Sequence, residues 1–471
     1  MLDKIKKIIA KPEYVFLMPA VLFGLTSAFI MPQLSANDEN MHFVRSYQLT
    51  ELQVGRKCTI PADIKDRGFS QIYEKQPANF SFESKAIDKN NKVNANCGTA
   101  TPYNPIMHLP QALGVFIAKI TYPSTGNMVL FGRIVNILVY CAGIFFIIRA
   151  SRMGKWVLVV IGLMPTLINT ASSLSGDVMN NLIVLGFIVY LFNLYTQKEK
   201  MNHRQLAKLI ALSMLLAATK STNIILLLLV LFLPARIMPK VTLRGVRPSN
   251  LITRIGIISL AVFAALMVFM AWSAIYNEPT VAALGATNPI LENPRRLLNV
   301  LYNSYINPDI MFGGVVFADW LFRSVIGSFT SFQYHLPYYL VVVIFSLMVI
   351  LGLKKDSAED KMVKTPEGVR LAVVGVASLI ISIIVITYGL YTAWSILPSI
   401  LGVDAKYAQG LQGRYFTPLL ILLVPLAIRL RKYVSVTFRS DMLTGVVVLV
   451  VMCSALLFYA LQTIQYAAII T

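Results

Sequence analysis

The sequence predicts an all-α fold: a polytopic membrane protein of about 11 transmembrane helices, with a small external loop subdomain and interfacial helices. Three observations predict it. Of the 471 residues, 56% are hydrophobic and only 14% are charged, against about 25% charged in a typical soluble chain. The apolar residues come in blocks of about 17 to 25, the length with which a helix crosses a bilayer. Short basic segments separate many of these blocks, as the positive-inside rule expects of cytoplasmic loops.

The formal net charge of +20 does not indicate a nucleic-acid partner. The basic residues are spread over the short segments between apolar blocks, where they report membrane topology and contact with anionic lipid headgroups. The sequence has no P-loop and no nucleophile elbow, so ATP-driven transport and serine hydrolase chemistry are unsupported. The predicted location is the plasma membrane, with the N-terminus inside and the C-terminus outside.

The N-terminal part predicts one span and a long polar loop. Four lysines precede the first apolar block, at about 14–33, which therefore runs outward. The polar segment that follows, to about residue 105, is long enough for a small external subdomain. It contains Cys58 and Cys97, which in an oxidising compartment are either a disulfide pair or two free thiols. The apolar stretch 106–122 is interrupted by proline and glycine and is interpreted as a re-entrant or interfacial helix.

The remaining blocks predict ten further spans. The block 206–233 is too long for one helix and has Lys220 in its middle, so we expect two short helices joined by an external turn. The other blocks end at basic residues on alternate sides. They lie at about 128–148, 156–174, 178–195, 255–276, 336–353, 371–391, 415–428 and 442–461.

This order divides the chain into five parts, which alternate between membrane and external segments. They are the N-terminus and first span (1–33), the external loop subdomain with interfacial helices (34–125), helices 2–7 (126–276), a second external segment (277–335) and helices 8–11 (336–471).

The predicted topology gathers charged residues at the external face. Asp38, Glu39, His42 and Arg45 follow the first span in "SANDENMHFVRSYQ", and the helix expected there places three of them near one side. Charged residues at membrane depth are costly and tend to be functional. We therefore treat the two adjacent acids as catalytic candidates, because a positioned carboxylate can take a proton from an attacking hydroxyl. The alternative is that the acids only cap the helix.

Three further charged residues are predicted at the same level. Asp177, in "SSLSGDVMNN", either caps a helix or orients a substrate, and with Asp38 it is a candidate divalent-cation ligand. Lys220 either extends to the interface or meets a phosphate. Arg414, in "LQGRYFTP", follows a glycine that permits close backbone approach, and its guanidinium suits phosphate oxygens; structural pairing is the alternative.

Neighbouring polar and aromatic residues complete the predicted substrate site. Tyr103 and Tyr415 can stack on a sugar, although aromatic residues are also common at membrane interfaces. Gln412 lies in the same motif as Arg414. His42 and Arg45 are further substrate-binding candidates. No histidine–carboxylate spacing specifies zinc, so the only cofactor that we consider is a possible divalent cation.

The motifs "NDENMHFVRSYQL", "YNPIMHLPQALG", "SSLSGDVMNN" and "GLQGRYFTPLL" occur in an order that resembles the bacterial multi-pass proteins of domain of unknown function family 2142. That family looks similar to GT-C membrane glycosyltransferases, in which the first external loop holds the catalytic acid and the donor is a polyprenyl-phosphate sugar. The resemblance implies that the acid is Asp38 or Glu39 and that Asp177 fills a second acidic position. The family usually has a proline before the acidic pair, where this chain has Ala36 and Asn37, so which acid acts stays open.

Two classes of function follow. The first is a glycosyltransferase that moves a sugar from a lipid-linked donor to a surface glycan or a teichoic-acid-like acceptor. A polymerase or ligase of whole glycans differs from it only in the size of the donor. The second is a transporter or flippase of lipid-linked sugars, in which the same charges line a pathway; such proteins often have inverted repeats, and the sequence shows none.

Overall fold

The computed structural model describes residues 8–69, 86–97, 104–239, 250–276, 288–327, 335–363 and 366–470. Within these ranges, six helices are long and apolar enough to cross a membrane. They are α2 Pro12–Ile30, α6 Thr125–Ala150, α9 Asp177–Thr196, α11 Asn250–Tyr276, α17 Pro366–Leu390 and α19 Asp441–Ile470. Each coincides with a predicted span, so the chain is a polytopic helical membrane protein.

The other five predicted spans are broken or short. The span expected at 156–174 divides into α7 Lys155–Leu163 and α8 Pro165–Ala171, because Pro165 forces the residue before it out of the helical conformation. The block 206–233 forms α10 His203–Thr219 and the 3₁₀ helix η3 Ser221–Phe232, with Lys220 at the break, as expected. The last two are α15 Tyr338–Gly352 and the consecutive elements η8 Thr417–Leu423 and α18 Val424–Leu430.

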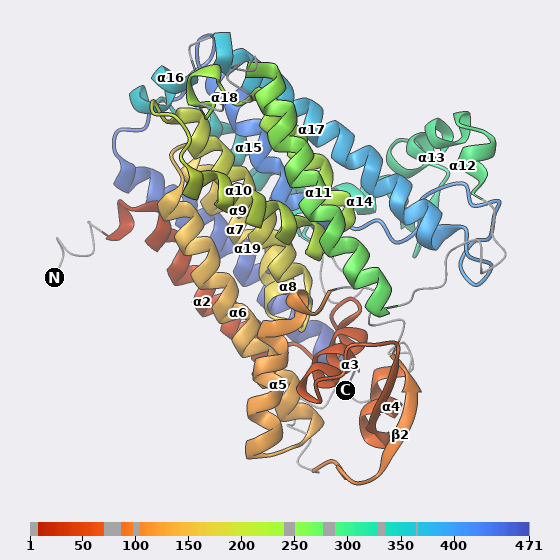
Figure 1. Cartoon of the computed structure of the whole chain (residues 1–471). Helices are drawn as coiled ribbons and strands as arrows, with labels where there is room; N and C mark the ends of the chain where they lie inside the picture. The colour runs from red at the N-terminus through yellow and green to blue at the C-terminus, as the bar shows by residue number, and fades with distance from the viewer. Residues whose placement is uncertain are drawn as a thin grey trace.

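A small subdomain follows α2 and lies at the lower end of the bundle in Figure 1. It contains α3 Glu39–Thr50, α4 Ala62–Phe69 and an antiparallel pair of strands, β1 Lys57–Pro61 and β2 Lys92–Asn96. Cys58 and Cys97 form a disulfide, which resolves the alternatives left open by the sequence. The predicted all-α class holds for most of the described residues, and these short strands are an addition to it, because a strand such as "KCTIP" is set by pairing with a distant segment, Lys92–Asn96, and not by a helical pattern.

The stretch 106–122 forms η2 Pro105–His108 and α5 Leu109–Thr121. A Cβ atom at Gly114 would lie 2.2 Å from the carbonyl oxygen of Phe131, so this glycine lets α5 cross α6 closely. Lys119 near the end of α5 forms an ion pair with Glu51, at the end of α3, and also contacts the ring of Tyr47. The far end of α3 is therefore tied to α5.

The segment predicted to be the second external one contains short elements that pack near the end of α17. They are α12 Pro289–Glu292, α13 Arg295–Tyr305, the strands β3 Met311–Phe312 and β4 Val315–Val316, and α14 Phe317–Ile326. The semi-apolar helix expected in "FADWLFRSVIGSF" is α14. Its C-terminal end lies against the Gly413 motif, as described below.

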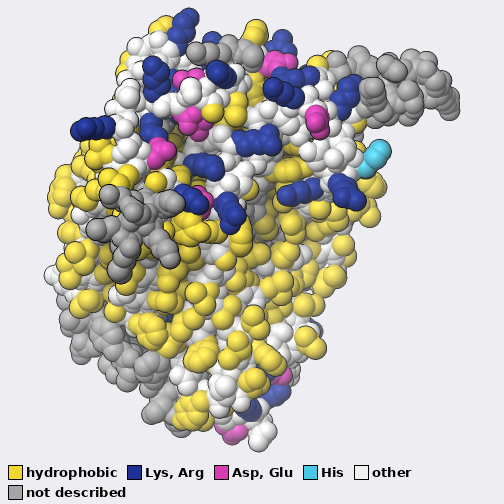
Figure 2. Space-filling view, turned by 90° about the vertical axis from the view of Figure 1, so that its left-hand side faces the viewer, with side chains coloured by type: hydrophobic (Ala, Val, Ile, Leu, Met, Phe, Trp, Pro, Cys, Tyr) yellow, Lys and Arg dark blue, Asp and Glu magenta, His cyan; other side chains and the backbone are white. Residues whose placement is uncertain are grey.

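The two ends of the bundle differ in chemistry. Figure 1 places α16 Ser357–Val363 and α18 at the upper end. Figure 2 shows most of the Lys and Arg side chains of the visible face at this end, above a broad hydrophobic band. We call it the basic end. The opposite end, with α3, α4 and the paired strands, is called the disulfide end. Helix α9 is the most enclosed spanning helix, with 72% of its span buried, and it begins toward the disulfide end.

Candidate functional site

Four charged side chains from separate parts of the chain meet beside the subdomain. The Oδ1 atom of Asp177 lies 2.7 Å from Nζ of Lys220, and its Oδ2 atom lies 3.0 Å from Nε of Arg414. The Nη2 atom of Arg414 donates to Oδ2 of Asp38 at 3.1 Å. We call Asp38, Asp177, Lys220 and Arg414 the four-charge cluster. Two acids and two bases alternate in it, so its formal charge is zero.

Local backbone structure places each member. Asp38 precedes α3 in the left-handed conformation, at φ 61°, which aspartate tolerates better than most residues. Asp177 is the first residue of α9, where the helix dipole stabilises a carboxylate. Lys220 occupies the extended break between α10 and η3, and Arg414 lies in η7 Gly413–Tyr415. Irregular backbone of this kind is tolerated at membrane depth where it is enclosed by protein.

The members of the cluster differ in exposure. The side chains of Arg414, Asp177 and Lys220 are 9%, 8% and 18% exposed, whereas that of Asp38 is 58% exposed. A buried charge must be paired, because removing its partner leaves an uncompensated charge away from water. Asp38 is therefore the one member that is both tied to the cluster and open to an incoming molecule.

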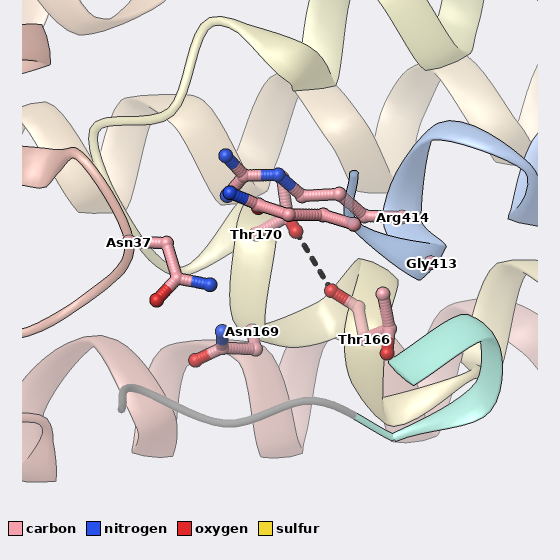
Figure 3. Close-up of a pocket in the computed structure, with 7 residues that line it drawn as sticks. Asn37, Thr166, Asn169, Thr170, Gly413 and Arg414 are labelled. Carbon is pink, nitrogen blue, oxygen red and sulfur yellow. Dashed lines mark hydrogen bonds between the residues drawn. The ribbon is translucent and has the colours of Figure 1, made fainter. Parts of the chain in front are cut away.

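A small cavity adjoins Arg414. Its volume is about 10 Å³, which is room for about one water molecule. It is lined by Asn37, Thr166, Asn169, Thr170, Gln412, Gly413 and Arg414. Figure 3 shows Arg414 extending across this space, with the amides of Asn37 and Asn169 facing it. Among the described residues, no group hydrogen-bonds the buried Oε1 atom of Gln412. The cavity thus offers amide groups and a guanidinium beside the cluster.

Gly413 sets the position of Arg414. Its N–H donates to Oγ of Ser324 at 2.8 Å, and a Cβ atom there would lie 2.1 Å from the backbone nitrogen of Val325. Only glycine allows η7 to approach the end of α14 this closely. The sequence interpretation expected a close backbone approach at this glycine, and the structure shows that the partner is the backbone at the end of α14.

Replacing Gly413 by alanine is expected to push η7 away from α14 and to weaken both ion pairs of Arg414. Overpacking of this kind costs about 1–3 kcal/mol, so the apparent melting temperature in detergent should fall. The matched control is Gly256→Ala, because Gly256 has a helical backbone and open space around its Cβ position. Gly402 also has open surroundings, but its φ of 78° would strain any other residue. Equal melting temperatures for the Gly413 and Gly256 variants would contradict the prediction.

Two buried histidines lie next to the cluster. Nδ1 of His42, one turn into α3, lies 2.8 Å from Nε2 of His108, at the start of α5. One nitrogen must donate and the other must accept, so the facing nitrogens cannot both carry a proton. Burial lowers the pKa of both imidazoles, although the carboxylates of Asp38 and Asp177 raise that of His42. The pair is therefore neutral at pH 7.

The pKa directions give a pH prediction. Because burial lowers the pKa of both histidines in the folded chain, the unfolded chain takes up protons on them more readily, so the folded state loses stability as the pH falls through about 6.5. The loss approaches about 1.4 kcal/mol per pH unit for each histidine. Melting curves between pH 7.5 and 5.5 measure it. The slope should be shallower in a His42→Asn, His108→Gln double variant and unchanged in His203→Gln, which alters an exposed histidine; an unchanged slope in the double variant contradicts the prediction.

Glu39, the second acid of the pair, is held apart from the cluster. It is fully buried, and its carboxylate accepts from Nε of Arg133 at 2.8 Å and from Nη2 at 2.6 Å. Its Oε1 atom also accepts from the backbone N–H of Leu174 at 3.1 Å. Arg133 donates further to the carbonyl oxygens of Met31 and Pro32. This ion pair joins the loop before α3 to α6 and to the turn before Asp177.

Sequence reasoning missed Arg133. The signal that could have found it is a lone arginine inside the apolar block 128–148, because a charge at that depth needs an opposite charge.

The other predicted site residues are placed as follows. Nζ of Lys220 lies 4.1 Å from the ring centre of Tyr415, so this ring belongs to the site. Arg45 bonds Gln48 and contacts the ring of Trp272. Tyr103 lies outside the described residues.

The acids of the cluster are paired with cationic side chains. Arg414 bridges Asp38 and Asp177, and Lys220 binds the remaining oxygen of Asp177. In the described ranges there is no group of three His, Cys, Asp or Glu side chains that could hold a metal ion. The carboxylates are arranged for cationic side chains, and we derive no step through a divalent cation.

Comparison with known proteins gives one match. Residues 21–423, which include the whole four-charge cluster, match the family described as predicted membrane protein (DUF2142). No curated protein and no solved structure matches the chain. The chain belongs to the DUF2142 family of predicted membrane proteins.

Proposed function

We propose that this protein is a membrane glycosyltransferase that moves a sugar from a polyprenyl-phosphate donor to an acceptor hydroxyl on a surface glycan. The observation that carries the proposal is an exposed carboxylate, Asp38, fixed 3.1 Å from a buried guanidinium, Arg414. A base beside a cation that can bind phosphate is the minimum that direct displacement at a sugar carbon requires. A GT-C-like arrangement of the helices is part of the same proposal.

The proposed orientation puts the disulfide end outside and the basic end in the cytoplasm. The Cys58–Cys97 disulfide supports it, because such bonds persist in oxidising compartments. The Lys and Arg side chains at the opposite end support it through the positive-inside rule. The donor then lies in the outer leaflet of the plasma membrane, with its phosphate at the level of the cluster.

In the proposed reaction, Asp38 takes the proton of the acceptor hydroxyl, and the acceptor oxygen attacks the anomeric carbon. The bond from that carbon to the phosphate oxygen breaks, and the polyprenyl phosphate leaves with the electron pair. Arg414 and Lys220 stabilise the negative charge on the leaving phosphate. One displacement inverts the anomeric configuration, and no covalent intermediate with the protein forms. Glu39 has no part in this step, because its carboxylate is buried against Arg133.

Mass spectrometry of surface glycans from cells with and without the protein tests the proposal. A sugar substituent that is missing without the protein, and restored by the wild-type gene, supports glycosyl transfer and identifies the donor and the acceptor. Shortened glycan chains would favour a polymerase or ligase. Transport of a lipid-linked sugar by the purified protein in vesicles, with no new glycosidic bond, would overturn the proposal in favour of a flippase.

A further inference from the structure

Arg414 binds two carboxylates that differ in how firmly they are held. Asp177 is 8% exposed, is also bound by Lys220 at 2.7 Å and stands at the N-terminus of α9. Asp38 is 58% exposed, and Arg414 is its partner in the cluster. Desolvated, doubly paired charges are strongly held, whereas an exposed ion pair contributes little. Of the two acids, Asp38 is the one that another anion can replace.

Charge balance limits which anion can do so. The cluster as it stands has two positive and two negative charges. If Asp38 turns toward solvent, Asp177, Lys220 and Arg414 together retain one positive charge in a mostly buried site. An anion with one negative charge restores neutrality, whereas an anion with two charges leaves a net negative charge, which is unfavourable away from water. A phosphodiester carries one charge.

We propose that a singly charged phosphodiester takes the place of the Asp38 carboxylate on Arg414, and that this exchange frees Asp38. The inference rests on the proposed function, and it adds an order of events: the donor binds first, and only then is the base available to the acceptor. In the resting protein the Asp38–Arg414 ion pair keeps the base occupied. The donor thus removes the contact that blocks its own reaction.

The geometry around Arg414 favours the exchange. Its Nε atom faces Asp177 at 3.0 Å and its Nη2 atom faces Asp38 at 3.1 Å, so replacing Asp38 leaves the Asp177 contact intact. Lys220, which lies over the ring of Tyr415 at 4.1 Å, keeps its own contact to Asp177. The guanidinium can therefore change one partner while the rest of the cluster stays in place.

Carboxyl labelling tests the exchange directly. The purified protein in a phosphate-free maltoside detergent is treated with a water-soluble carbodiimide and an amine, and the labelling of each acid is read by mass spectrometry. Farnesyl methyl phosphate, a phosphodiester with one charge, should raise the labelling of Asp38 by about twofold or more, because the competing ion pair is lost. Asp319 is the matched control, since it is an exposed acid paired with Arg323 at 3.6 Å and lies outside the cluster.

The choice of probes separates the sources of the phosphodiester. Dimethyl phosphate tests the group without a lipid chain, phosphatidylglycerol tests an ordinary membrane lipid, and farnesyl diphosphate tests the more highly charged class. The proposal expects the farnesyl phosphodiester to act most strongly and the diphosphate to act weakly. An equal effect of phosphatidylglycerol would assign the site to membrane lipid and overturn the donor-specific proposal.

The Asp38→Asn variant supplies the second measurement. Without a carboxylate to displace, the farnesyl phosphodiester should bind this variant about two- to fivefold more tightly than the wild type. The exchange is overturned if the farnesyl phosphodiester binds without changing the labelling of Asp38, or if it binds the variant no more tightly than the wild type. The proposed function is then still decided by the glycan experiment. No binding to either protein overturns both the exchange and the assignment of Arg414 as the phosphate ligand.

Discussion

Replacing Asp38 by asparagine is expected to lower sugar transfer by about 10²- to 10⁴-fold, the usual contribution of a general base. The amide keeps the size of the side chain and can still accept a hydrogen bond from Arg414, but it cannot take the proton of the acceptor. Transfer is measured as the fraction of surface glycan that carries the sugar, by mass spectrometry of cells that express each variant.

The same change should leave the fold intact. Asp38 is 58% exposed, and substitutions of exposed side chains usually change stability by less than about 0.5 kcal/mol. Expression level and melting temperature should therefore match the wild type. Asp319→Asn is the matched control, because it also removes an exposed acid that is paired with an arginine, and it should keep full transfer. Full transfer by the Asp38→Asn variant would refute the assignment.

Replacing Arg133 by methionine is expected to destabilise the protein by about 3–5 kcal/mol, because it leaves the buried carboxylate of Glu39 without its partner. The side chains of Arg133 and Glu39 are 3% and 0% exposed, so water cannot take the place of the lost contact. The carbonyl oxygens of Met31 and Pro32 also lose a donor. The measurement is the thermal melting of the purified protein, together with its yield as a monodisperse sample.

A double variant separates pairing from packing. Adding Glu39→Gln to Arg133→Met removes the buried charge, so the double variant should be more stable than Arg133→Met alone. Arg149→Met, which changes an exposed basic residue at the end of the same helix, should melt like the wild type. An Arg133→Met protein that melts at the wild-type temperature would show that the ion pair contributes nothing.

Much of the fold was predictable because bilayer thickness and loop charge are strong constraints. The six long helices follow the apolar blocks closely, and the break at Lys220 was expected from a charge inside a block too long for one helix. The break at Pro165 was missed, although the proline was visible, because hydrophobicity alone joins the two pieces. The β1–β2 pair was missed because strand pairing depends on contacts distant in the sequence.

The site was predictable in position but not in detail. Topology alone put Asp38, Asp177, Lys220 and Arg414 at one end, and the structure brings them into contact. Two adjacent acids look alike in a sequence, and only the location of Arg133 separates the buried Glu39 from the exposed Asp38. The contacts of Arg45 with Gln48 and the ring of Trp272 were likewise not visible in the sequence, and its role in substrate binding stays a prediction.

Helix α3 is anchored at both of its ends, by Glu39 on Arg133 at the start and by Glu51 on Lys119 just past the finish. Twelve residues of helix make a stiff rod about 18 Å long. A rod fixed at both ends resists tilting, so it holds the neighbouring Asp38 carboxylate at a set position relative to α5 and α6.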